Sequence, residues 1–262
     1  MNQEKINLAA ESLYKDFTNR SKFTLMTEDF APLDIEEAYA VQATYMDLRA
    51  VKSGNYAGYK IAYTTEVMRQ IRGAKEPVYG RIFKSDVINS PAAVPASSYI
   101  HLGVECEIAV IIGDDLNSKN GFIDKDTVFG AVKSIAIAFE IIDMRSSLGI
   151  TSIPQSIATN ISGAGVVIGK SVENWRNLNI SESKCELKIN GKSVGCGMGS
   201  DINGHPVEPI AWLANALLSR GKYLKSGDLV ITGSMITPTF LQESTDAVLK
   251  MDNLGSVTLS VD

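Results

Sequence analysis

The sequence predicts an α+β protein in which a smaller helical part precedes a larger part built mainly from strands. Apolar residues recur at helical spacing along the first fifty residues. From residue 57 onwards, short runs rich in β-branched residues alternate with turn-forming Gly, Pro and Asn. We place the boundary near residue 75, so that 1–75 form the helical part with one strand and 76–262 the strand-rich domain. A chain of 262 residues with 45% hydrophobic content can bury a substantial core.

Composition and charge exclude several classes of protein. The net charge of -5 and the scattered basic residues argue against a nucleic-acid partner. The polar start and the lack of an apolar run of about 18 residues predict neither a signal peptide nor a membrane anchor, and hence a cytoplasmic protein. Three cysteines without a C-x-x-C pair predict no disulfide framework. We therefore expect a small-molecule partner.

Two helices are expected before residue 55. The first has apolar residues at helical spacing from Ile6 to Phe17, and the second begins at Asp34, with Glu37 completing a capping box. A short strand over 57–63 then places Lys60 on one face, between the small residues Gly58 and Ala62. Small neighbours leave room beside the amine, which suggests a pocket. A solvent-facing lysine on an edge strand is the equally weighted alternative, because lysine is seldom buried.

Two acids lie in a run that is typical of a buried strand, 104–112. Side chains alternate across a strand, so Glu105 and Glu107 share one face while Cys106, Ile108 and Val110 share the other. Two anions in an apolar setting are costly unless a cation lies between them. A metal ion would meet that need.

A third acid, Glu140, lies in the strand expected over 135–143. One such glutamate could equally form a buried ion pair with Arg145 or Lys60. A single ion pair could explain one buried glutamate, but it explains three glutamates in apolar strands less well. The following segment from Ile157 to Gly169 is rich in glycine and small polar residues, which fits either an anion site or a plain turn.

The C-terminal third contains clearer secondary-structure signals. Asn190-Gly191 predicts a hairpin with a type I′ turn, and a helix is expected from about residue 207 to residue 220. Two final strands, 247–251 and 256–261, should pair across Asp252-Asn253.

The chemistry of the three glutamates points to a hard dication. His101 and His205 lack the spacing of a zinc motif, so an all-oxygen site for Mg²⁺ or Mn²⁺ is expected. Such an ion chelates a 1-carboxylate together with a 2-oxo oxygen and stabilises an enolate. Lys60 would supply positive charge or shuttle protons. Chemistry of 2-oxo acids is thus indicated.

At these residues the sequence resembles the 2-keto-4-pentenoate hydratases and 4-oxalocrotonate decarboxylases of the fumarylacetoacetase superfamily. The likeness covers almost the whole chain. The segments that carry it, in order, are Gly58 to Ile61, Val104 to Ala109, Glu140 to Arg145, Gly204 to Pro206 with Ala211 to Ala214, and Gly227-Asp228 with Thr232-Gly233.

The resemblance implies a fold, ligands and partners. The fold would be a mixed β-roll, forming the catalytic domain 76–262, after a smaller helical N-terminal part. Glu105, Glu107 and Glu140 would bind Mg²⁺ or Mn²⁺, with Lys60 as the active-site lysine. We expect a homo-oligomer that acts on a small 2-oxo or 2-hydroxydienoic acid.

The segment from Ala158 to Gly163 departs from the family pattern. The family usually has Ala-Asp-Asn-Ala-Ser-Ser here, whereas this chain has Thr159 for the acid and Gly163 for the last serine. Asn160 and Ser162 keep the pattern and are our predicted substrate-binding residues. The substrate pocket is therefore expected to differ more from the family than the metal site does.

The sequence favours a hydratase that adds water to a 2-hydroxy-2,4-dienoate through a metal-bound dienolate, giving a 4-hydroxy-2-oxo acid. Ala211 to Ala214 resembles the hydratases, whereas Glu76 to Gly80 resembles the decarboxylases. A decarboxylase of 4-oxalocrotonate type passes through the same dienolate and is the alternative. Hydrolysis of a carbon–carbon bond is the weaker third choice, because no histidine precedes His101. The altered segment also leaves open a metal-binding homologue without turnover.

Overall fold

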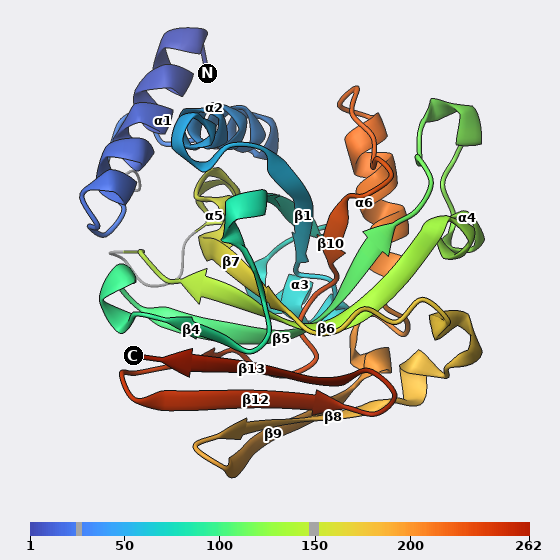
Figure 1. The fold of residues 1–262 in the computed structure, drawn as a ribbon. Helices are drawn as coiled ribbons and strands as arrows, with labels where there is room; N and C mark the ends of the chain where they lie inside the picture. Colours follow the sequence, from blue (N-terminus) through green and yellow to red (C-terminus); the bar gives the residue numbers. More distant parts are fainter. Residues whose placement is uncertain (25–27, 147–151) are drawn as a thin grey trace.

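The computed structural model describes residues 1–24, 28–146 and 152–262 (Figure 1). Its helices are α1 (Gln3–Thr18), α2 (Ile35–Ser53), α3 (Glu66–Arg72), α4 (Lys125–Ala131), α5 (Ile153–Ala158) and α6 (Glu208–Leu218). Both expected N-terminal helices are present. Asp34 caps α2 by accepting a hydrogen bond from the Glu37 N–H. The Glu37 carboxylate also accepts from the Leu33 N–H and the N-terminal amine.

Strands of the described residues form two sheets. The larger has the order β2-β1-β10-β5-β6-β7-β3, with β11 paired to one end of β5. Its strands are β1 (Tyr56–Ala62), β2 (Val78–Phe83), β3 (Val87–Asn89), β5 (Leu102–Ile112), β6 (Val132–Asp143), β7 (Gly163–Ile168), β10 (Leu229–Ile231) and β11 (Thr239–Phe240). The smaller, in the order β4-β13-β12-β8-β9, has β4 (Ala92–Val94), β8 (Lys184–Ile189), β9 (Lys192–Met198), β12 (Thr245–Met251) and β13 (Gly255–Val261).

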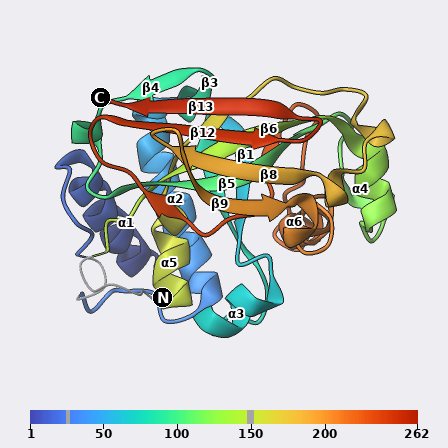
Figure 2. The ribbon, with the colours of Figure 1, turned by 90° about the horizontal axis from the view of Figure 1, so that it is seen from below.

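The two faces of β5 have different surroundings. Cys106, Ile108 and Val110 belong to the main core, which also contains Leu249 and Leu259 of the smaller sheet. Figure 2 shows the smaller sheet lying across the larger one, with α4 and α6 toward one end and α1 toward the other. The opposite face of β5 carries Glu105 and Glu107, as the strand alternation predicts. The fold therefore directs both acids away from the main core.

Buried polar contacts join the helical part to the sheet. The Gln42 amide on α2 donates to the carbonyl oxygens of Tyr79, at 3.1 Å, and Ile157, at 2.8 Å. Arg145, at the end of β6, donates to the Phe17 carbonyl on α1 and lies over the Phe17 ring. A buried donor is costly to leave unpaired, so these contacts fix α1, α2 and α5 beside the strands.

The predicted α+β architecture, with its smaller helical N-terminal part, is confirmed. The hairpin around Asn190 and the final strand pair form as expected. Helix α5 was not predicted, because its short sequence precedes a glycine-rich segment and has no helical periodicity. The domain boundary near residue 75 stays a prediction. β1 comes before that boundary in the sequence, yet it lies in the larger sheet between β2 and β10. Among the described residues, no helix is long and apolar enough to span a bilayer.

Candidate metal centre and active site

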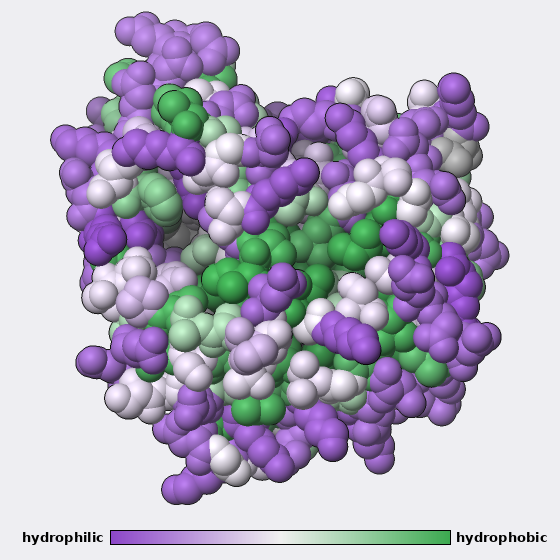
Figure 3. Space-filling model, in the orientation of Figure 1, coloured by the Kyte–Doolittle hydropathy of each residue, from purple (hydrophilic) through white to green (hydrophobic). Residues whose placement is uncertain are grey.

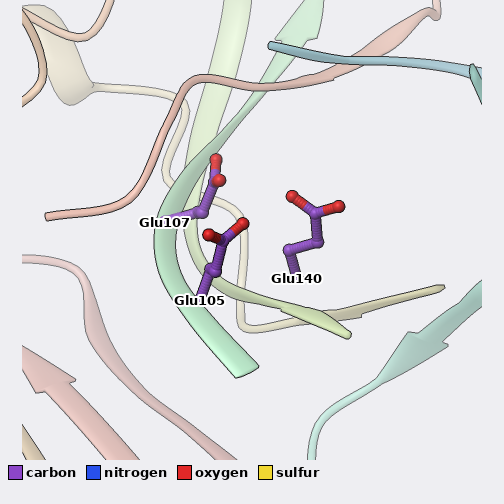
Figure 4. A group of neighbouring side chains, drawn as sticks. All are labelled: Glu105, Glu107 and Glu140. Atoms are coloured by element: carbon purple, nitrogen blue, oxygen red, sulfur yellow. The ribbon is translucent and has the colours of Figure 1, made fainter. Parts of the chain in front are cut away.

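The antiparallel pairing of β5 and β6 brings the three predicted glutamates together. Glu105 lies directly opposite Glu140, and Glu107 follows two residues later on the same face of β5. One carboxylate oxygen from each residue lies within 4.8 Å of the other two. Figure 4 shows all three side chains pointing into the same space. The register of two strands thus converts acids 35 residues apart into one cluster.

Burial differs among the three carboxylates. Glu107 and Glu140 are each 1% exposed, whereas Glu105 is partly exposed and forms the open side of the cluster. Glu107 Oε2 accepts a hydrogen bond of 2.7 Å from the Gly233 N–H. Glu140 Oε1 accepts from Lys60 Nζ at 2.5 Å, while Glu140 Oε2 is buried without a partner among the described residues. An unpaired buried carboxylate oxygen is costly and marks a place for a ligand.

Burial and mutual repulsion change the acidity of this cluster. Burial, together with the charges of Glu140 and Glu105, raises the pKa of Glu107 well above its ordinary value. Burial likewise raises the pKa of Glu140 to about 8, against the opposing effect of Lys60. With Lys60 as the ion-paired cation beside the described cluster, Glu107 and Glu140 therefore hold their protons more tightly than glutamates in water do. A bound dication would reverse that preference.

Lys60 is the one cation that an ion pair places against the described cluster. Its side chain is 2% exposed, and Nζ donates to Glu140 and, at 2.9 Å, to the Ile161 carbonyl. Burial disfavours the charged amine, but Glu140 and Glu105 outweigh this effect and raise the pKa of Lys60. The solvent-facing alternative is thus wrong, and the small neighbours of Lys60 correctly indicated an enclosed position. The ion pair with Glu140 also forms, yet it leaves Glu140 Oε2 unpaired.

The donor set fits a hard dication. Three carboxylates offer only oxygen, which suits Mg²⁺ or Mn²⁺ better than softer metals. The unpaired Glu140 Oε2 and the convergent oxygen atoms provide ligand atoms that the protein itself does not satisfy. On this geometry the cluster can hold a metal ion.

The Asn160–Ser162 segment adopts an unusual backbone beside Lys60. All three residues have positive φ, at 56°, 51° and 57°, which is a strained conformation for residues other than glycine. The turn presents the Ile161 carbonyl to Lys60. The side-chain amide of Asn160 both accepts from the Arg81 N–H, at 2.7 Å, and donates to the Arg81 carbonyl, at 3.0 Å. Asn160 therefore fixes this turn to β2, and substrate binding by Asn160 and Ser162 stays a prediction.

The two departures from the family pattern have distinct structural consequences. The Thr159 hydroxyl donates to the carbonyls of Gln155 and Ser156 in α5, so it is bonded within the helix and does not take the role of the usual acid. At Gly163, an added Cβ would lie 3.3 Å from both Glu140 Oε1 and Lys60 Cδ. The missing serine therefore gives the Lys60–Glu140 pair more space.

Two backbone groups were not predicted as parts of the site. They are the Gly233 N–H, which supports Glu107, and the Ile161 carbonyl, which supports Lys60. Thr232-Gly233 is one of the segments that carry the family resemblance, but a single sequence gives no sign that a backbone N–H acts as a donor. Its role depends on β10 lying next to β5.

Comparison with known proteins agrees with this fold. Over 249 residues the chain is 27% identical to 2-hydroxyhexa-2,4-dienoate hydratase of Comamonas testosteroni, covering 94% of each chain. It is 28% identical over 257 residues to 2-keto-4-pentenoate hydratase of Paraburkholderia phymatum, covering 98% of this chain and 97% of the other.

Solved structures include a match along the whole chain. A 4-oxalocrotonate decarboxylase from Pseudomonas putida G7, solved with magnesium and adipate, superposes with a TM-score of 0.92 at 23% identity. The match covers 100% of this chain and 99% of the other, which establishes the shared fold. The family described as fumarylacetoacetate (FAA) hydrolase C-terminal matches residues 61–262. The chain therefore belongs to the FAA hydrolase C-terminal family.

Proposed function

We propose that this protein is a metal-dependent hydratase. It would add water to a 2-hydroxy-2,4-dienoate of 2-keto-4-pentenoate type and release a 4-hydroxy-2-oxo acid. The observation that carries the proposal is the convergence of three glutamates beside one buried lysine. Two hydratases that align with nearly the whole chain support this reaction.

Glu105, Glu107 and Glu140 would hold Mg²⁺ or Mn²⁺. Such a dication supplies a Lewis acid for the 1-carboxylate and 2-oxo oxygens of the substrate. Glu105 is the partly exposed member, so we propose that substrate enters on its side of the cluster. The Gly233 N–H holds Glu107 in place from the opposite side.

Lys60 would hold and move the proton that the reaction needs. Its raised pKa keeps Nζ protonated, and a protonated amine has three N–H donors. Two of these donate to Glu140 and to the Ile161 carbonyl, which leaves one for a substrate oxygen or carbon. Burial excludes bulk water from the amine, which strengthens its charge interactions.

A decarboxylase of 4-oxalocrotonate type is the second candidate. The turn that contains Glu76 favoured it, whereas the helix that contains Trp212 favoured the hydratase. Trp212 Nε1 donates to the Glu76 carboxylate at 3.2 Å, so the two segments meet in one contact. Neither segment therefore distinguishes a hydratase from a decarboxylase. Activity measured with substrates of the two reactions must decide between them.

A homo-oligomer is part of the same proposal. Strands β5, β6, β7 and β10 carry a second apolar cluster on the face opposite the main core, and Ile111 and Ile168 of this cluster are only partly buried. Figure 3 shows apolar surface in the middle of one face of the molecule, surrounded by hydrophilic surface. Light scattering of the purified protein tests the oligomer directly.

Two substrates separate the candidate reactions. Purified protein is incubated with 2-hydroxypenta-2,4-dienoate or with 4-oxalocrotonate, each with Mg²⁺ or with a chelator, while dienol absorbance and CO₂ are followed. A hydratase consumes the dienol without gas and only with metal. Gas from the diacid would identify the decarboxylase. Metal binding with no turnover of either compound would overturn both and leave a non-catalytic homologue.

A further inference from the structure

A second cleft lies at the start of β1, away from the carboxylate cluster. It has a volume of about 540 Å³ and lies between β1, β2 and the turn that follows α6. Figure 1 shows β1 between α2 on one side and α6 on the other. Of the described residues that line this cleft, none is a member of the glutamate cluster. Its size falls in the usual range of small-molecule sites.

Positive charge accumulates in this cleft although the whole chain is acidic. Four basic residues line it, namely Arg81, Lys84, Lys222 and Lys225, against the single acid Asp228. The excess is three positive charges, four minus one, in a chain whose net charge is -5. No ion pair within the described ranges joins any of the four to a carboxylate. Within that part of the chain, the four cations are therefore held without a direct ion pair, and Asp228 and Asp47 act on them only from a greater distance.

The contacts around the cleft hold these groups in place without neutralising them. Asp228 Oδ2 accepts the Lys225 N–H at 2.8 Å and so closes the turn. The Arg81 guanidinium lies 4.5 Å from the centre of the Tyr56 ring. Partial burial and the charge of Arg81 lower the pKa of Lys222. Like charges have thus been brought together at a cost that an anionic ligand would remove.

Aromatic rings form the rest of the wall. Tyr59 and Tyr223 line the cleft and are half-buried. Tyr59 packs edge-on against Tyr79, which fixes the orientation of its ring. Half-buried tyrosines combine an apolar ring with a hydroxyl that can reach a polar group. Lys225 Nζ lies 5.7 Å from the centre of the Tyr223 ring, so the cleft places ring surface next to cations that form no direct ion pair in the described part of the chain.

We propose that this cleft binds a small organic diphosphate that carries a planar ring, of the nucleoside diphosphate class. A diphosphate group carries about three negative charges near neutral pH. This number matches the excess of three positive charges among the residues that line the cleft. Lys84, Lys222 and Arg81 would contact the phosphate oxygens, while Tyr59 and Tyr223 would pack against the ring. This site is independent of the proposed reaction.

Calorimetric titration of the metal-free protein with ADP, inorganic pyrophosphate and adenosine tests the proposal. We expect one ADP per chain, weaker binding of pyrophosphate and no saturable binding of adenosine. The Lys84→Glu/Lys222→Glu variant should bind ADP at least about tenfold more weakly. Tyr59→Leu should weaken ADP and leave pyrophosphate unchanged.

Matched controls separate this cleft from other effects. Lys192→Glu is also a charge reversal at an exposed lysine, but on β9 of the other sheet, and should leave ADP binding within about twofold. Glu107→Gln should not change ADP binding either, whatever its effect on turnover. The proposal is overturned if neither ADP nor pyrophosphate binds saturably, if the Lys192 control weakens ADP as much as the double reversal, or if adenosine alone binds as well as ADP.

Discussion

Two acids on strand β6, Glu140 and Asp143, are both buried beside a basic residue, yet their oxygen atoms are bonded differently. Asp143 Oδ1 accepts the N–H groups of Ile100 and His101, each at 2.9 Å, and Oδ2 accepts from Arg145 Nε at 2.6 Å. Glu140 accepts from Lys60 through Oε1, while its Oε2 lacks a partner within the described part of the chain. One acid is fully bonded by the protein and the other is not.

This difference separates a structural ion pair from a binding group. Asp143 and Arg145 connect the end of β6 to α1 and to the segment before β5, and every contact they need lies within the chain. Glu140 instead faces Glu105 across the strand pair and is near Glu107, so its surroundings repel its own charge. Folding alone gives no reason for this arrangement. A cation bound between the acids does.

The largest expected effect is on turnover in Glu107→Gln, which keeps the shape of the side chain and removes its charge. We expect metal-dependent activity to fall by about 10³-fold, equivalent to about 4 kcal/mol of lost transition-state stabilisation. The free energy of unfolding of the metal-free variant should not fall, because burial and the neighbouring acids already disfavour the ionised form of Glu107, and an amide cannot ionise. Steady-state kinetics across a Mg²⁺ titration measure this. Full activity at limiting Mg²⁺ would exclude Glu107 from the ligands.

In Asp143→Asn we expect the opposite result, a loss of folding stability with metal affinity retained. Removing this charge leaves Arg145 buried without its counter-ion, which costs about 3 kcal/mol of folding stability. The affinity for Mg²⁺ should stay within about twofold of the unaltered protein, since Asp143 is not part of the glutamate cluster. Urea unfolding measures the loss of stability, and a Mg²⁺ titration on the same preparation measures the metal affinity. A large loss of metal affinity would remove the contrast between the two acids.

The pH dependence of the metal-free protein should reflect the glutamate cluster. Glu140 has an ordinary pKa of 4.5 and a raised pKa of about 8 in the folded chain. Between these values the folded chain holds a proton that the unfolded chain has lost, so stability falls as the pH rises from about 5 to 8, by on the order of a few kcal/mol. Saturating Mg²⁺ should flatten this dependence, because the metal favours the ionised acids.

Urea denaturation at pH 5.5 and pH 8, with chelator or with Mg²⁺, measures this effect. The Glu140→Gln variant is the matched control, since an amide in the same position does not titrate. It should lose part of the pH dependence of the metal-free protein. Metal-free protein that becomes more stable as the pH rises through this window would contradict the proposed environment of Glu140.

The smallest expected effect concerns Gly163→Ala. The new Cβ would lie 3.3 Å from the Asn160 carbonyl oxygen, Glu140 Oε1 and Lys60 Cδ, so these neighbours must shift by a few tenths of an ångström. The backbone φ of -63° suits alanine, so the fold should be retained. We expect kcat to fall by less than about tenfold, with metal affinity nearly unchanged. A fall in kcat of more than about a hundredfold, or a clear loss of metal affinity, would contradict this expectation.

Local patterns predicted much of the fold and the acidic part of the site. Strand alternation correctly placed Glu105 and Glu107 on one face, and small neighbours indicated room at Lys60. Contacts that depend on distant pairing could not be predicted in this way. The Gly233 N–H reaches Glu107 only because β10 pairs with β5, and no residue pattern predicts positive φ at Ile161.

The second cleft is a further feature that local sequence patterns could not predict. Its basic residues are far apart in the sequence, Arg81 and Lys84 near β2 and Lys222 and Lys225 after α6, so they read as scattered charges. The parallel pairing of β1 with β10 brings the two segments together. Gly58 permits this close approach, since a Cβ there would lie 1.9 Å from the Leu229 carbonyl oxygen. A sequence without known strand order does not contain that information.

The central claim is that Glu105, Glu107 and Glu140 together bind one hard dication beside Lys60. Titration with Mn²⁺, followed by electron paramagnetic resonance of the free ion, tests it most directly in the chelator-treated protein and its variants. We expect one Mn²⁺ per chain, lost or weakened at least about a hundredfold in Glu107→Gln and retained in Asp143→Asn. Equal Mn²⁺ binding by the unaltered protein and Glu107→Gln would contradict the claim.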